Sequence, residues 1–194
     1  GWDPHHPRNL VSGSQDNTLK LWDVNNKKCA ATFKPKNEAV RDIQYSPLHE
    51  HRFAAVFENG NLQVWDVRQY SQPEIKIVAH NKTTMSVDWH RSTPWRLATG
   101  SHDRTVKVWD LNNVTANKLS TTDHEAHSKH PATLSATRTQ TVAPGLTLQA
   151  PGPVSRAKWR PDHPDQIALA AGEKGMLIMS LKEPHVPLVA FEMG

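Results

Sequence analysis

Cysteine is almost absent from this sequence, whose 194 residues include one, Cys29. A single cysteine cannot form a disulfide framework within the chain, and this usage fits a reducing compartment. Long apolar runs are missing as well, since no stretch approaches the roughly 18 apolar residues of a membrane-spanning helix. We therefore expect neither a disulfide-rich secreted domain nor an integral membrane protein.

The sequence also lacks a large excess of charge of either sign. The chain carries 23 Lys and Arg residues against 19 Asp and Glu residues, a net charge of +4. This excess is too small to indicate a nucleic-acid partner, and we expect none. The basic cluster Lys27, Lys28, Lys34 and Lys36 is interpreted as a solvated strand edge that resists aggregation, in preference to a patch for anionic lipid or nucleic acid.

Tyrosine is rare with two copies, whereas tryptophan is abundant with seven, and the tryptophans reveal a repeat. Segments 11–23, 54–66 and 98–110 align without gaps, and their tryptophans lie 43 and 44 residues apart. Each segment ends in a Trp-Asp pair: Trp22 and Asp23, Trp65 and Asp66, Trp109 and Asp110. A period of about 40–45 residues ending in Trp-Asp is typical of the four-stranded blades of a WD-repeat propeller.

Each repeat unit has the pattern strand, tight turn, strand. Leu19 and Leu21 alternate with Lys20, which is typical of a half-buried strand. Six residues before each tryptophan stands a residue type that favours turns. These residues are Asp16, Asn59 and Asp103, followed by Asn17, Gly60 and Arg104.

Further strands complete the units. An earlier strand recurs at 40–47, 85–90 and 154–161, and short apolar runs at 29–33 and 75–78 follow the Trp-Asp pairs. A degenerate fourth unit spans 167–181, with Met179 and Ser180 in place of Trp-Asp. We expect an all-β WD-repeat β-propeller of about four blades, with blades one to three in residues 1–111 and the fourth in residues 150–194.

Residues 112–149 interrupt the repeat. They are rich in Ser, Thr and His and poor in apolar side chains, so we expect an inserted disordered loop, with the last strand of blade three near 146–149. His124, His127 and His130 in this loop do not match the His-Glu-x-x-His zinc motif. A solvated polar loop is the preferred interpretation over a metal site.

The chain holds about three and a half blades, because Trp2, Asp3 and Pro4 look like the end of a first strand. Propellers close with about four to eight blades, and an open arc would expose its strand edges. We expect the chain to be part of a longer ring, of seven blades, in preference to a ring completed by a second chain.

The aligned units resemble WD-repeat propellers over nearly the whole chain outside the insert. Four segments taken in order, 57–68, 87–90, 97–110 and 158–161, are similar to the propeller subunits of the GATOR/SEA assembly. The Glu-Asn-Gly-Asn turn within 57–68 is unusual among WD repeats. The long insert and the lost Trp-Asp of blade four depart from the family, and one cysteine cannot supply the family's zinc-binding RING region.

This resemblance implies a non-enzymatic scaffold that promotes amino-acid signalling to TOR complex one. It implies protein subunits as partners, including small nucleoporin-type propellers, and a cytoplasmic location at the lysosomal or vacuolar membrane surface. Contact with the membrane would come only through the complex. The alternative is an unrelated WD-repeat adaptor for histone tails, peroxisomal cargo or ubiquitin-ligase substrates.

The same family pattern implies a buried structural tetrad in blade three. Its members are His80, Thr99 or Ser101, Asp103 and Trp109. A hydroxyl, imidazole and carboxylate also suggest a hydrolase, but a repeated structural motif explains them, so we expect no catalytic, cofactor-binding or metal-ligating residues.

The other histidines of the N-terminal half do not stand at the tetrad position of blades one and two. Blades one and two lack the tetrad histidine, so we expect their hydrogen-bond networks to be incomplete. The remaining histidines near the N-terminal half are expected to be scattered at blade connections; they are His5, His6, His49 and His51.

Overall fold

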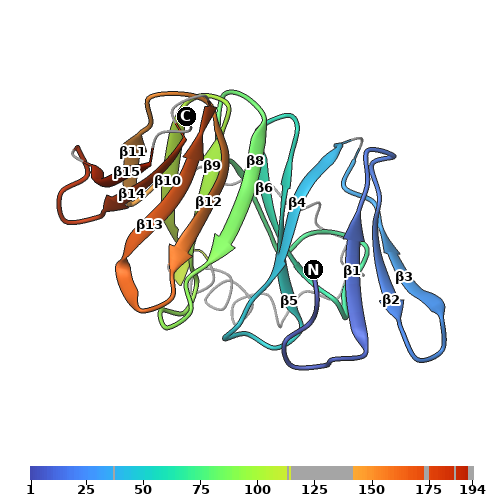
Figure 1. Cartoon of the computed structure of the whole chain (residues 1–194). Coiled ribbons are helices and arrows are strands. Elements are labelled where there is room, and N and C mark those ends of the chain that lie inside the picture. The colour runs from blue at the N-terminus through green and yellow to red at the C-terminus, as the bar shows by residue number, and fades with distance from the viewer. Residues whose placement is uncertain (37, 113, 115–141, 173–174, 186, 192–194) are drawn as a thin grey trace, which may run out of the picture.

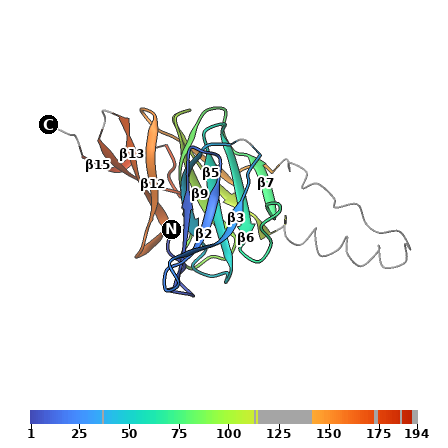
Figure 2. The ribbon, with the colours of Figure 1, turned by 90° about the vertical axis from the view of Figure 1, so that its right-hand side faces the viewer.

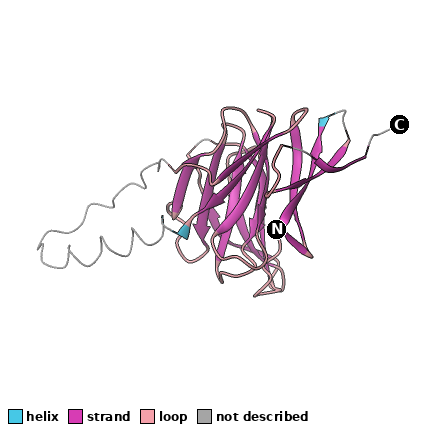
Figure 3. Ribbon diagram, turned by 90° about the vertical axis from the view of Figure 1, so that its left-hand side faces the viewer, coloured by secondary structure: helices cyan, strands magenta, loops and turns pink. Residues whose placement is uncertain are grey.

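Four antiparallel sheets make up the computed structural model of the chain. It describes residues 1–36, 38–112, 114, 142–172, 175–185 and 187–191. Over these residues fifteen strands follow one another, and the sheets lie side by side in chain order (Figure 1). Strands account for most of the described chain (Figure 3). The expected all-β fold with blade-like sheets is confirmed.

The sheets are numbered as blades one to four. Blade one has β1 (Asn9–Gly13), β2 (Leu19–Asp23) and β3 (Lys28–Phe33). Blade two has β4 (Val40–Tyr45), β5 (Arg52–Phe57), β6 (Asn61–Asp66) and β7 (Ile75–Val78). Blade three has β8 (Thr84–Trp89), β9 (Arg96–Ser101), β10 (Thr105–Asp110) and β11 (Leu146–Gln149). Blade four has β12 (Val154–Arg160), β13 (His163–Ala171), β14 (Met176–Ser180) and β15 (Pro187–Phe191).

Blade three is completed by a strand at the end of the expected insert, where the sequence predicts it. β11 pairs with β10 in antiparallel register from Thr105 opposite Gln149 to Val108 opposite Leu146. Most of the expected disordered loop, residues 113 and 115–141 with its three histidines, lies outside the described residues. Among the described residues, no helix has the length and apolar character needed to cross a membrane.

Blade one begins with a fragment of its first strand. Trp2 makes an isolated antiparallel bridge with Leu10. The same register recurs where Trp89 faces Leu97 and Trp159 faces Ile167. Trp2 therefore occupies the place at the end of a first strand that the sequence predicts. It is 60% exposed, whereas its counterparts Trp89 and Trp159 are buried between two blades.

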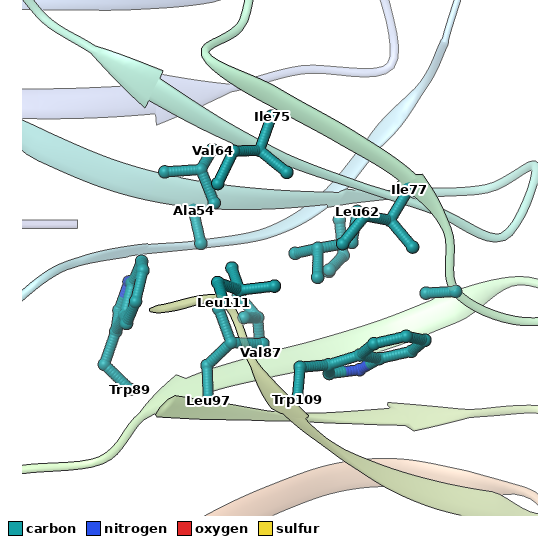
Figure 4. Close-up of a cluster of buried hydrophobic side chains, with 12 residues drawn as sticks. Ala54, Leu62, Val64, Ile75, Ile77, Val87, Trp89, Leu97, Trp109 and Leu111 are labelled. Atoms are coloured by element: carbon teal, nitrogen blue, oxygen red, sulfur yellow. The ribbon is translucent and has the colours of Figure 1, made fainter. Parts of the chain in front are cut away.

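The hydrophobic core lies between neighbouring sheets. The first strands form successive contacts, β4 with β8 and β8 with β12, while β1 contacts β4 (Figure 1). β7, the outer strand of blade two, lies on the opposite side of the molecule from β12 (Figure 2). Figure 4 shows one interface, in which side chains of blade two face those of blade three. They include Ala54, Leu62, Val64, Ile75, Ile77, Val87, Trp89, Leu97, Trp109 and Leu111.

The turns expected from the sequence join β1 to β2, β5 to β6 and β9 to β10. Each turn contains a residue in the left-handed region: Asn17 with φ 66°, Gly60 with φ 86° and Arg104 with φ 69°. The Asp or Asn side chain before it accepts a hydrogen bond from the backbone N–H two positions on, as the Asx-turn requires. These short turns place the tetrad residues of β9 and β10 on neighbouring strands.

Candidate functional site: hydrogen-bonded networks of the blades

Blade three contains a continuous chain of hydrogen bonds through four side chains. The indole Nε1–H of Trp109 donates to Thr99 Oγ1 at 2.9 Å. The Thr99 hydroxyl lies 2.7 Å from His80 Nε2, and His80 Nδ1 lies 2.9 Å from Asp103 Oδ2. Ser101, the alternative hydroxyl, instead donates to the carbonyl oxygen of Thr83 at 2.9 Å. Thr99 therefore supplies the hydroxyl of the tetrad.

The electrostatics of this chain favour a neutral imidazole. Burial lowers the pKa of His80 to about 4, outweighing the opposite effect of Asp103. Burial of Asp103 acts against its charge, but hydrogen bonds from Thr105 and His80 prevail and lower the pKa of that carboxyl. At neutral pH the network thus assigns one proton to His80 Nδ1, which donates to ionised Asp103, while Nε2 accepts from Thr99.

Solvent cannot reach the hydroxyl at the centre of the tetrad. Thr99 is 0% exposed and His80 is 2% exposed. The hydroxyl already accepts from one partner and donates to another, so neither a free hydroxyl proton nor an open approach remains for a substrate. The arrangement satisfies buried polar groups, which is a structural task.

Blade two has a different network, and the expectation that it would be incomplete is wrong. Trp65 Nε1–H donates to Gln63 Oε1 at 3.0 Å, and Gln63 Nε2 donates to Glu38 Oε2 at 2.9 Å. The other Glu38 oxygen pairs with the ammonium group of Lys76. An amide, a carboxylate and an ammonium here replace the hydroxyl, imidazole and carboxylate of blade three.

Strand register explains the replacement. In blade three Thr99 on β9 faces Lys107 on β10, whereas at the same place in blade two Ala55 on β5 faces Gln63 on β6. Ala55 has no hydroxyl, so the acceptor for the Trp65 indole comes from Gln63, on the same strand as the tryptophan. Gln63 stands two residues before Trp65 and so shares its strand face, which is the signal in the sequence that indicates this network.

Blades one and four are simpler. In blade one, Trp22 Nε1–H donates to Ser12 Oγ at 2.8 Å, and Ser12 stands at the repeat position of Thr99. In blade four, Met179 takes the tryptophan position, is 3% exposed and faces Ile167. A thioether has no N–H to satisfy, so this blade can lose the polar network at no desolvation cost.

The aspartates of the Trp-Asp pairs stabilise the turns after their strands. Asp23 Oδ1 accepts from the backbone N–H groups of Asn25 and Asn26 at 3.0 and 3.1 Å. Asp66 and Asp110 likewise accept from the backbone N–H two residues on, at 2.9 and 3.0 Å. In blade four the Ser180 hydroxyl accepts from Lys182 N–H at 3.2 Å, so serine retains this function.

A second set of hydrogen bonds joins one blade to the next. Trp89 donates Nε1–H to the carbonyl oxygen of Gln44 at 3.1 Å and its backbone N–H to Gln44 Oε1 at 3.2 Å. Trp159 donates Nε1–H to the carbonyl oxygen of Asp88 at 3.1 Å and its backbone N–H to Asp88 Oδ2 at 2.7 Å. The same pair of contacts therefore fixes blade three on blade two and blade four on blade three.

The sequence did not indicate these inter-blade acceptors. Gln44 and Asp88 precede the aromatic residue of a first strand, but their donors lie 45 and 71 residues further along. Arg156 Nη1 on β12 reaches back still further and donates to Asp42 Oδ2 on β4 at 2.9 Å. Asp42 Oδ2 also accepts the backbone N–H of Val87 at 3.1 Å, so one carboxylate contacts both following blades.

The structure also brings together two of the histidines that we expected to be scattered at blade connections. His6, in the turn before β1, stacks on His51, in the turn between β4 and β5, with ring centroids 5.1 Å apart and an interplanar angle of 13°. Glu50 lies next to both rings. The two histidines are 45 residues apart in sequence, about one repeat period, and meet because blade one packs on blade two.

Comparison with known proteins agrees with this repeat architecture. Residues 1–23 and 71–110 match the family described as WD40, WD domain, G-beta repeat. These ranges include the Trp-Asp pairs of blades one and three. The chain thus contains segments that match WD repeats.

Individual relatives extend the match across the length of the chain. It is 35% identical over 185 residues to the GATOR2 complex protein WDR24 of Homo sapiens, covering 94% of the chain and 20% of the relative. It is 31% identical over 189 residues to GATOR2 complex protein Wdr24 of Drosophila melanogaster, covering 95% and 20%. Restriction of telomere capping protein 1 of Vanderwaltozyma polyspora is 25% identical over 186 residues, covering 81% and 14%. The chain spans about a fifth of the length of the GATOR2 relatives it matches.

Proposed function

We propose that this chain is the propeller portion of a non-catalytic scaffold subunit in a GATOR2-type assembly. The observation that carries the proposal is the 35% identity to human GATOR2 complex protein WDR24, which covers 94% of the chain. A match of this extent involves all four blades and so exceeds what a shared Trp-Asp repeat alone would produce.

The chemistry of the blades supports a scaffold role. His80, whose pKa is lowered by burial, is 2% exposed and is held in a structural network with the buried Thr99 and the partly exposed Asp103. Hydrogen bonds from Trp89 and Trp159 fix successive blades on one another. A stiff body that presents several faces suits the simultaneous binding of several proteins.

The finer parts of the proposal concern the cellular setting. We propose that the subunit promotes amino-acid signalling to TOR complex one and acts at the cytoplasmic surface of the lysosome or vacuole. Its partners are other subunits of the assembly, including small nucleoporin-type propellers, and membrane contact comes only through the complex. An assembly role of this kind requires no nucleic acid.

Affinity purification tests the proposal. The full-length protein is tagged at its own locus and purified from its own cells, with an unrelated tagged WD-repeat protein as control, and the bound proteins are identified by mass spectrometry. We expect GATOR2 or SEA subunits and nucleoporin-type propellers in fixed stoichiometry, co-migrating on gel filtration. A different stable partner set, such as histones, peroxisomal cargo or a ubiquitin ligase, would support the adaptor alternative.

The signalling part needs its own measurement. Cells depleted of the protein are starved of amino acids and re-fed, and phosphorylation of TOR complex one substrates is followed. We expect a weaker recovery that expression of the wild-type protein restores. An unchanged recovery would overturn the signalling role while leaving the scaffold role intact.

A further inference from the structure

Two turns meet at the junction of blades one and two. The first is the turn before β1, which Asp3 organises: its Oδ1 accepts the backbone N–H groups of His5 and His6 at 2.9 and 3.1 Å. The second is the turn between β4 and β5, which contains Glu50 and His51. The Asp3 side chain is fully buried, so the position of the first turn is fixed relative to the body of the blade.

Three ligand-type atoms converge between these turns. Glu50 Oε1 lies 3.2 Å from His6 Nε2 and 3.7 Å from His51 Nε2. One ligand atom from each of the three residues can be chosen so that all lie within 4.8 Å of one another. The two imidazole rings stack nearly parallel, with their centroids 5.1 Å apart.

Asp3 orients the His6 ring through the ring nitrogen that does not face Glu50. Its Nδ1 lies 3.2 Å from Asp3 Oδ2, an acceptor-only group, so Nδ1 carries the proton of the neutral ring and donates it there. His6 Nε2 then presents a lone pair to a carboxylate oxygen at 3.2 Å, and two acceptors at this distance repel each other. Either a second proton or a metal cation between them removes the repulsion.

We propose that His6, Glu50 and His51 form a surface site for Zn²⁺. Zinc prefers imidazole nitrogen and carboxylate oxygen, and its bond lengths place tetrahedral ligands roughly 3.3 Å apart. The distances from Glu50 Oε1 to the two imidazole nitrogens bracket that value. A water molecule completes the tetrahedron on the open side. Two neutral nitrogens and a single carboxylate are unsuited to Ca²⁺ or Mg²⁺, which require a shell of oxygen ligands.

Asp3 acts as the positioning residue of this site. A carboxylate on the far nitrogen of a metal-bound histidine fixes the tautomer and raises the basicity of the ligand. The buried Asp3 carboxylate has this relation to His6 before any metal arrives. A bound ion would also tie the turn before β1 in blade one to the turn between β4 and β5 in blade two.

The test measures metal binding by the full-length protein, purified without a histidine tag and stripped of metal. Zn²⁺ affinity is measured by calorimetry, and Co²⁺ serves as a spectroscopic probe for a tetrahedral site. Wild type is compared with His6→Gln, His51→Gln and Glu50→Gln. The matched control is His5→Gln, which removes a neighbouring imidazole that is outside the cluster. Circular dichroism establishes that each variant is folded.

We expect wild type and His5→Gln to bind one more equivalent of Zn²⁺ than the double variant His6→Gln/His51→Gln. Each single ligand variant should weaken that site by at least about tenfold and lose the intense visible bands of tetrahedral Co²⁺. Asp3→Asn should weaken it by about 10–100-fold, because the amide can still accept from the turn but is a poorer partner for the imidazole.

Equal stoichiometry and affinity in wild type and the double variant would overturn the proposal. The proposal would also be overturned if the His5→Gln control and the double variant bound Zn²⁺ over the same range of concentrations. In that case the His6–Glu50–His51 contacts are held by protons alone. Because Glu50 is exposed, Glu50→Gln keeps the test decisive even if a histidine variant fails to fold. Neither result depends on which proteins the chain assembles with.

Discussion

His80 and Asp103 lie 23 residues apart, yet His80 Nδ1 stands 2.9 Å from Asp103 Oδ2 across the buried edge of blade three. The imidazole is neutral in the folded protein, because burial lowers the pKa of His80 to about 4. An unfolded histidine titrates near 6.5, so between these two values the unfolded chain binds more protons than the folded one. This pair makes the stability of blade three sensitive to mild acid.

The first prediction follows from that difference. As pH falls from about 6.5 to 4, His80 should lower the free energy of unfolding by up to about 1.4 kcal/mol per pH unit. Urea denaturation of wild type and His80→Gln over this range measures it, and the wild-type slope should be the steeper. Parallel slopes, or a folded-state NMR titration of the His80 ring near its ordinary pKa, would contradict it. The Asp103 contribution is lost only at lower pH, because its pKa is lowered below the usual value.

Thr99→Val tests the centre of the tetrad. Valine fills the same volume but leaves the Trp109 N–H and His80 Nε2 without their shared partner. We expect the free energy of unfolding to fall by about 1–3 kcal/mol. The control is Thr147→Val on β11, a half-buried position that should change little. A neutral effect of Thr99→Val would show that the network contributes nothing to stability.

The network of blade two can be tested by a double-mutant cycle. Glu38→Gln removes the charge that pairs with Lys76 and weakens the acceptor for Gln63. We expect a loss of about 1–3 kcal/mol, since Glu38 is buried and Lys76 would lose its counter-ion. The double variant Glu38→Gln/Lys76→Gln should recover part of that loss. Additive effects of the two substitutions would mean that the pair is not coupled.

Gly100 is required by the close approach of two blades. A Cβ there would lie 2.7 Å from Val154 Cγ1 and 3.2 Å from Ala157 Cβ, both on β12, and 2.8 Å from Ser86 Oγ on β8 of its own blade. Gly100→Ala should therefore push blade four away and lower the free energy of unfolding by about 1–3 kcal/mol.

Gly145→Ala provides the matched control for that substitution. A Cβ at Gly145 meets only Val108 O at 3.7 Å, an ordinary contact. We expect it to be neutral or stabilising by about 0.4–1 kcal/mol, because alanine restricts the unfolded chain. Thermal denaturation of both variants measures the difference, and equal melting temperatures would argue against packing at this interface.

Local features of the molecule could be predicted from the sequence. The period-two alternation in β2, the turns at Asp16, Asn59 and Asp103 and the Trp-Asp spacing all depend on interactions within one blade. The tetrad was accessible for the same reason, since His80, Thr99, Asp103 and Trp109 belong to a single repeat unit whose pattern is shared with a family.

The network of Gln63 and Glu38 lies at the edge of what sequence can indicate. The shared strand face of Gln63 and Trp65 is visible in the chain, but the reach of Glu38 to Gln63 over 25 residues depends on how blade two closes. From the sequence alone, the absence of a tetrad histidine in blade two suggested that the indole N–H of Trp65 lacks a partner.

The sequence by itself determined the all-β repeat and the order of the strands, because both depend on short-range spacing along the chain, and the family resemblance implied the blade-three tetrad. Only the tertiary structure decided the contacts between blades: Trp159 on Asp88, Arg156 on Asp42, and the group of His6, Glu50 and His51. Those residues belong to different repeat units. They meet because apolar faces of separate sheets pack together and bring distant turns and strands into contact.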